Sequence, residues 1–75
     1  MGEMRIMDAV KGDLKVVWDK NKPDEIKAAQ DQFKSLTKKG YIAFKVKKGG
    51  DAGKQIRKFD EKAEKIILSP ALQGG

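Results

Sequence analysis

Apolar side chains recur at helical spacing between Pro23 and Gly40. They are Ile26, Ala29, Phe33 and Leu36, separated by three, four and three residues. At about 3.6 residues per turn, this spacing places all of them on one face of a helix. The single narrow stripe predicts a helix that buries one face against a flat partner.

Both ends of this segment carry helix-boundary signals. Pro23 suits the first helical position, where a missing N–H costs nothing. Asn21 or Lys22 precedes it as the cap, and Asn21 is the better capping residue. Gly40 can adopt the left-handed conformation that ends a helix. We therefore predict a helix from Pro23 to Lys39.

Two stretches before the helix alternate between apolar and polar positions. The first runs from Met4 to Val10, and the second from Leu14 to Trp18. The second is rich in β-branched and aromatic residues, which are typical of strands. Lys11–Asp13 contains a glycine and is typical of a tight turn. The pattern predicts an N-terminal hairpin.

The segment after the helix predicts a half-buried strand over Tyr41–Lys47. Ile42, Phe44 and Val46 alternate with residues that are on average more polar. Because successive side chains of a strand point to opposite faces, we expect these three apolar side chains to face the core.

The remainder contains a glycine-rich turn and a strongly apolar final segment. Lys54–Phe59 predicts either a short strand or an irregular segment anchored by its apolar residues. Asp60–Ala63 is typical of a turn. The unbroken apolar run within Lys65–Ser69 indicates a buried, central strand. Pro70 is expected to end it, because proline cannot donate to a sheet hydrogen bond.

These elements predict a single α+β domain over residues 1–70, with a flexible tail over 71–75. The order is β-β-α-β-(β)-β, with one helix on a mixed sheet. If the first and last strands pair in the centre, the layout is a β-grasp. The predicted core is Ile6, Leu14, Val16, Trp18, Ile26, Phe33, Leu36, Ile42, Phe44, Ile56 and Ile67.

Composition narrows the function classes. The 75 residues include no histidine and no cysteine, which excludes His-activated nucleophiles and imidazole or thiolate zinc sites. No carboxylate pair has an acid/base setting, so we expect a protein that is not an enzyme and needs no cofactor or metal. No apolar run approaches the ~20 residues of a membrane span. We expect a cytoplasmic protein without a membrane partner.

Positive charge concentrates around the glycine-rich loop. Lys and Arg number 17 against 11 Asp and Glu, a formal charge of +6. The residues that could form a basic face are Lys45, Lys47, Lys48, Lys54, Arg57 and Lys58, with Tyr41 as an aromatic neighbour. Such a face suits nucleic acid or an acidic protein. Alternatively, the lysines guard an exposed sheet edge against aggregation. The loop itself lacks the P-loop pattern, because Lys48 stands where glycine is required and Gln55 where Ser or Thr is required.

Gly74 and Gly75 form the most specific motif. A slim diglycine can enter a narrow activating-enzyme site that a Cβ would obstruct. Together with the element order, this end resembles the ubiquitin-like proteins. The resemblance implies a β-grasp fold and a protein modifier or carrier. Gly75 would be the conjugated residue, an activating enzyme its partner, and Lys11 or Lys48 an acceptor.

Three alternatives stay open. The carrier could serve sulfur transfer or only bind a partner. The segment from residue 49 to 64 could instead form a third hairpin in an α+β fold unrelated to ubiquitin. The rival function is that of a small basic nucleic-acid-binding or phage-type accessory protein that uses a lysine-rich sheet face.

Overall fold

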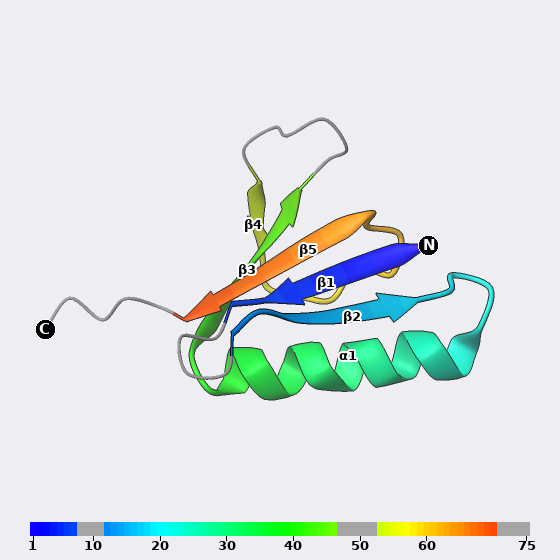
Figure 1. Ribbon diagram of the computed structural model, residues 1–75, viewed down its shortest axis with the longest axis horizontal. Coiled ribbons are helices and arrows are strands. Elements are labelled where there is room, and N and C mark those ends of the chain that lie inside the picture. The colour runs from blue at the N-terminus through cyan, green and yellow to red at the C-terminus, as the bar shows by residue number, and fades with distance from the viewer. Residues whose placement is uncertain (8–11, 47–52, 71–75) are drawn as a thin grey trace, which may run out of the picture.

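A computed structural model describes residues 1–7, 12–46 and 53–70. Within these ranges the elements are β1 (Gly2–Ile6), β2 (Leu14–Trp18), α1 (Pro23–Lys38), β3 (Tyr41–Val46), β4 (Lys54–Ile56) and β5 (Lys65–Pro70). The helix packs on one face of a mixed sheet (Figure 1). The predicted α+β domain with one helix on a sheet is therefore confirmed. The predicted tail, 71–75, lies outside the described residues.

The strands form one sheet in the order β2-β1-β5-β3-β4. β1 and β5 pair in parallel in the middle, with Met4 opposite Ile66 and Ile6 opposite Leu68. The other neighbouring strands are antiparallel. β5 therefore has a strand on each side, as its unbroken apolar run predicted.

The helix begins at the expected proline but is capped differently. Pro23 is the first residue of α1, and its N-cap is Lys22, which makes no side-chain capping bond. The backbone N–H of Asn21 instead donates to Oδ1 of Asp19 at 2.9 Å. Of the two caps that the sequence allowed, the structure has Lys22 and not the favoured Asn21, which belongs to the preceding turn. Gly40 has φ 103°, the left-handed conformation predicted for it.

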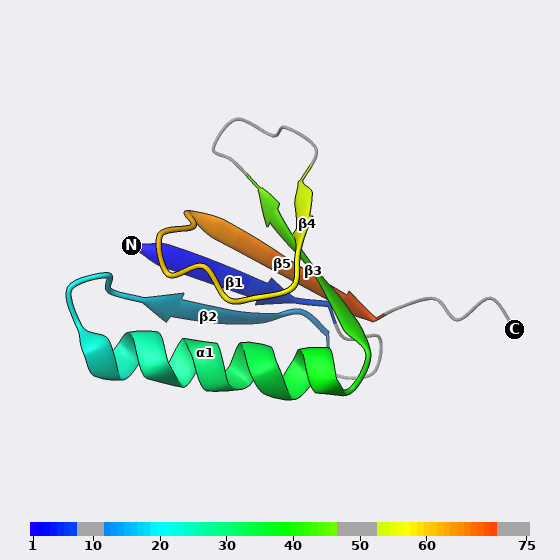
Figure 2. The same ribbon diagram turned by 180° about the vertical axis from the view of Figure 1, so that it is seen from behind.

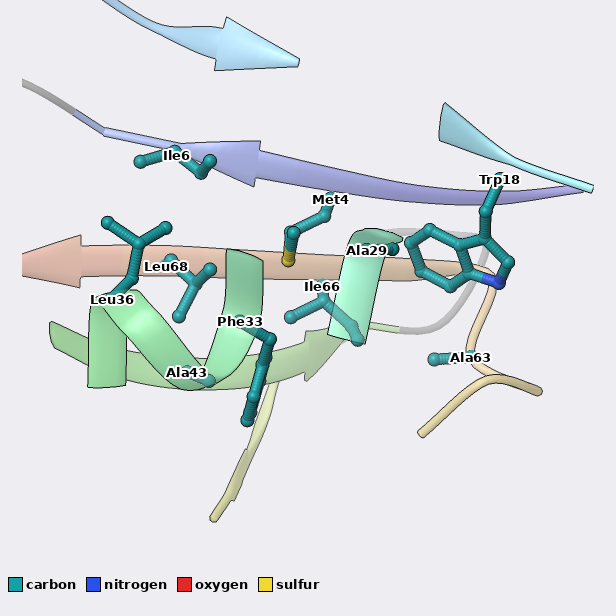
Figure 3. Packing of buried hydrophobic residues seen from close by; sticks show 10 residues of the cluster. All are labelled: Met4, Ile6, Trp18, Ala29, Phe33, Leu36, Ala43, Ala63, Ile66 and Leu68. Atoms are coloured by element: carbon teal, nitrogen blue, oxygen red, sulfur yellow. The ribbon is translucent and has the colours of Figure 1, made fainter. Parts of the chain in front are cut away.

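The core lies between α1 and one side of the sheet, which we call the helix face. Its buried side chains are Met4, Ile6, Trp18, Ala29, Phe33, Leu36, Ala43, Ala63, Ile66 and Leu68 (Figure 3). Val16, Ile26 and Ile56 are half-buried against this cluster. Burying each large apolar side chain contributes roughly 1.5–3 kcal/mol, so this cluster is the main source of stability.

Residues 57–64 connect β4 to β5 and complete the cover of the helix face; we call this segment the strap. The Phe59 ring lies 5.0 Å from the Trp18 ring and 5.8 Å from the Phe33 ring, measured between centroids. The indole Nε1 of Trp18 donates to the Glu61 carbonyl oxygen at 3.1 Å. Figure 2 shows the strap passing in front of β1 and β5. The indole is therefore held from the strap as well as from the sheet.

Strand boundaries differ from the predicted ones in three places. β1 starts at Gly2 and ends at Ile6, and Val10 lies outside the described residues. β4 ends at Ile56 because the chain bends into the strap. β5 includes Pro70 as its last residue, opposite Tyr41. A proline is tolerated at that terminal position, where a missing donor disturbs the ladder least.

The side chains of β3 point to the opposite faces of the sheet from those predicted. Ala43 lies opposite Leu68 and is buried on the helix face. Ile42, Phe44 and Val46 consequently point to the other side of the sheet and are half-buried. The predicted core positions of Ile42, Phe44 and Ile67 are therefore wrong. Leu14, also predicted as core, is 44% exposed. The predicted core omitted Met4, Ala29, Ala43, Ala63, Ile66 and Leu68.

Candidate functional site

The side of the sheet opposite the helix carries several apolar side chains that are only half-buried; we call it the open face. Side chains alternate between the two faces along each strand, so the residues between the buried ones point here. In Figure 1, β1 and β5 are seen with no described segment in front of them, whereas the strap crosses them in the reverse view. Among the described residues, neither α1 nor the strap covers this face.

Four half-buried apolar side chains lie together on the open face. Ile67 of β5 is directly opposite Phe44 of β3, and Ile42 and Val46 flank Phe44 along β3. Directly opposite residues have Cβ atoms about 4.5–5.5 Å apart, so these side chains form one continuous surface. We call Ile42, Phe44, Val46 and Ile67 the open-face patch.

Gly53 borders this patch at the start of the β4 side. A Cβ built on Gly53 would lie 3.0 Å from Cβ of Phe44 and 3.1 Å from Cγ2 of Val46. Few residues other than glycine fit so close to a neighbouring strand. The missing side chain therefore lets the backbone approach the patch closely.

The β1–β2 side of the open face is charged. Nε of Arg5 donates to Oε2 of Glu3 at 2.8 Å, and Nζ of Lys15 lies 3.5 Å from Oε1. The hydrogen bond from Arg5, with the nearby charge of Lys15, lowers the pKa of Glu3. Lys65 lies opposite both Glu3 and Val46. Three cations thus surround one ionised carboxylate beside the apolar patch.

The structure describes five of the seven residues of the predicted basic face. Lys45 points to the helix face, where its Nζ lies 3.0 Å from Oδ2 of Asp60. Tyr41 is half-buried against the core on the same face. Lys54 lies opposite Lys45 on the edge strand. These three residues therefore share the helix face, but Lys45 is engaged by Asp60 and Tyr41 is half-buried against the core.

The other predicted site residues divide into two groups. Arg57 and Lys58 lie exposed on the strap. Lys47, Lys48, Gly74 and Gly75, with the acceptor candidate Lys11, lie outside the described residues. The structure therefore gives no geometry for the diglycine.

The open-face patch was missed as a site because its residues were assigned to the core. Its signal was present in the sequence as alternating apolar positions in Tyr41–Val46. That alternation does not say which face receives the helix, and the partner strand β5 is apolar at consecutive positions. Which residues of β3 face the core is decided by contact with α1. The local sequence pattern carries no information about that contact.

Searches against protein-family models, curated proteins and solved structures found no match for this chain. Within residues 1–7, 12–46 and 53–70, no group of three or more Asp or Glu side chains is placed to hold a metal ion. In the same ranges no helix is both long and apolar enough to span a membrane. Function is therefore argued from the surfaces themselves.

Proposed function

We propose that this chain is a β-grasp protein that binds another protein through the open-face patch and acts as a modifier or carrier through Gly74–Gly75. The observation that carries the proposal is the patch itself. Phe44 and Ile67 are large apolar side chains that stay only half-buried on two neighbouring interior strands of the sheet. Contiguous apolar surface rimmed by polar groups is typical of protein-interaction sites.

The composition of the patch favours a protein partner over nucleic acid. Of its four side chains, three are aliphatic and only Phe44 offers a ring on which a base could stack. Aliphatic surface gains more from contact with apolar protein side chains. The neighbouring Arg5, Lys15 and Lys65 favour a partner with carboxylates beside its apolar contact.

The strand order supports the β-grasp assignment. A parallel pair of first and last strands in the centre is the arrangement on which the sequence prediction depended. β5 ends at Pro70, and Gly74–Gly75 follow within five residues. A strand fixed on both sides thus leads towards the diglycine, which suits a rigid body that presents a slim reactive segment.

Partner binding is tested by photo-crosslinking. A benzophenone side chain placed at Phe44 should capture a defined protein, and the same group placed at exposed Gln32 of α1 should not. The captured partner is then purified and its affinity measured by calorimetry. Ile67→Ser should weaken binding by at least tenfold, while Val17→Ser, an exposed change on the same face outside the patch, should alter it less than threefold. Equal losses in the two variants would refute the patch as the contact.

The modifier step is tested separately. Incubation with cell lysate and ATP should give higher-mass adducts, detected by immunoblot and located by mass spectrometry at the carboxyl group of Gly75. Gly75→Ala should abolish them, whereas Gln73→Ala should leave them. If adducts form without ATP, or persist in Gly75→Ala, the carrier chemistry does not reside in the diglycine.

A further inference from the structure

The strap and the end of β4 surround a second surface feature, on the opposite side of the sheet from the open-face patch. It is a shallow hollow of about 680 Å³ lined by Ile56, Arg57, Lys58, Phe59, Asp60, Glu61 and Lys62. Arg57, Lys58 and Lys62 are exposed. Ile56 and Phe59 are half-buried and give the hollow an apolar floor. Basic rim and apolar floor together define an amphipathic concave surface.

Asp60, an acidic residue of the hollow, already accepts hydrogen bonds from within the protein. Oδ2 of Asp60 accepts a hydrogen bond from Nζ of Lys45 at 3.0 Å, and Oδ1 accepts one from the backbone N–H of Lys62 at 3.0 Å. The hydrogen bond from Lys45 is the main cause of a lowered pKa for Asp60. Asp60 is therefore ionised at neutral pH but has both oxygens engaged within the protein, which leaves Glu61 as the hollow's other acid.

Two lysines face each other beside the hollow. Lys45 and Lys54 are directly opposite across β3 and β4. Like charges in this position destabilise a strand pair, and Asp60 forms an ion pair with Lys45. A bound anion would supply the second negative charge and relieve the repulsion.

We propose that this hollow binds the phosphodiester backbone of single-stranded nucleic acid, a site independent of the protein-binding face. Lysine is a compact point charge that suits single phosphate contacts. The apolar floor formed by Ile56 and Phe59 offers a surface for a base or sugar, which a purely acidic peptide would not use. Phosphate contacts come from Lys54, Arg57, Lys58 and Lys62.

The chain's net charge of +6 attracts any polyanion, so the experiment compares two variants with equal charge. One carries Arg57→Gln, Lys58→Gln and Lys62→Gln in the hollow. The control carries Lys27→Gln, Lys34→Gln and Lys38→Gln, all exposed on α1. Fluorescence anisotropy with a twelve-nucleotide oligothymidylate is measured from low to moderate salt. Circular dichroism melts of both variants establish that they are folded.

We expect the hollow variant to bind at least tenfold more weakly at low salt, and the control to change less than threefold. Loss of three phosphate contacts should reduce the slope of log affinity against log salt by about 2. In the unmodified protein, backbone amide signals from Ile56 to Lys62 should shift on titration, while those of Lys27 to Lys38 should not. Equal weakening of both variants, absence of binding at low salt, or equal competition by polyglutamate of matched charge would each overturn the proposal.

Discussion

The two faces of the sheet carry comparable apolar side chains in different environments. On the helix face, Met4, Ile66 and Leu68 are 0% exposed beneath α1 and the strap. On the open face, Phe44 and Ile67 occupy neighbouring strands at the same level and stay half-buried. An alternating apolar pattern such as that of β3 can therefore place side chains in the core or on the surface. What separates them is which face the helix and strap cover.

The comparison also assigns different tasks to similar residues. Phe33 packs edge-on against Phe59 inside the core, whereas Phe44 lies between its cross-strand partners Ile67 and Gln55 on the open face. Side chains of the first kind set the free energy of unfolding. Side chains of the second kind can be altered with less effect on the fold, which is the condition for a surface that binds a partner.

Truncating one phenylalanine in the core and one on the open face is the strongest test of this difference between core and surface side chains. Phe33→Ala should reduce the free energy of unfolding by roughly 3–5 kcal/mol, because it opens a cavity in the core. Phe44→Ala should cost only about 1–2 kcal/mol, since Phe44 is only partly buried and less of its surface is taken out of water. Urea unfolding followed by circular dichroism measures both values. Equal costs would mean that a segment covers the open face.

A pair of glycines provides the second test. A Cβ at Gly2 would collide with the indole of Trp18, which is fully buried. Gly2→Ala should therefore cost about 1–3 kcal/mol through overpacking. A Cβ at Gly53 would lie 3.0 Å from Cβ of Phe44, 3.1 Å from Cγ2 of Val46 and 3.2 Å from the backbone oxygen of Lys45, which is a tight fit but a milder one than the overlap with the indole.

We expect Gly53→Ala to cost less than Gly2→Ala in the same urea titrations. The melting temperatures should follow the same order. A larger loss in Gly53→Ala would show that the open-face patch is packed as rigidly as the core.

The sequence predicts the elements well because their signals are local. The α1 stripe, the Pro23 start and the Gly40 end follow from helix geometry and backbone conformation. The central position of β5 follows from its continuous apolar run. Each of these features can be derived from a few adjacent residues.

The phase of β3 could not be predicted in the same way. Ala43 is less apolar than its neighbours Ile42 and Phe44. It is buried nevertheless, because the helix face already holds large side chains such as Phe33 and Trp18. Ile66, Ile67 and Leu68 are all apolar, so β5 gives no indication of which face is covered. Only the three-dimensional placement of α1 resolves this, and with it the open-face patch.

The candidate sites were predictable to different degrees. Arg57, Lys58 and Lys54 were identified from charge alone, and the structure places them around or beside one hollow. The engagement of Lys45 by Asp60 depends on the strap folding back under β3. A contact between residues fifteen positions apart in an irregular segment leaves no periodic signal in the sequence.

The smallest expected difference concerns two of the ion-paired carboxylates, Asp60 on the helix face and Glu3 on the open face. Both have lowered pKa values, from hydrogen bonds donated by Lys45 and Arg5 respectively. A carboxyl whose folded pKa lies below its unfolded value stabilises the protein above the unfolded pKa. That stability is lost as the pH falls through the folded pKa. Both groups should therefore make the protein less stable in acid.

Substituting each carboxylate in turn shows how much each face contributes to the pH dependence of stability. Because the Asp60 side chain is 34% exposed, solvent screening limits its contribution to below about 1 kcal/mol. Asp60→Asn should flatten the dependence of melting temperature on pH between about pH 5 and pH 2. Glu3→Gln should flatten it less, since the pKa of Asp60 is lowered by Lys45 and also by a backbone hydrogen bond from Lys62, whereas the pKa of Glu3 is lowered by the side chains of Arg5 and Lys15. If Glu3→Gln produced the larger change, the open face would be the better shielded of the two, and its charged half would belong to the structural framework and not to a partner-binding surface.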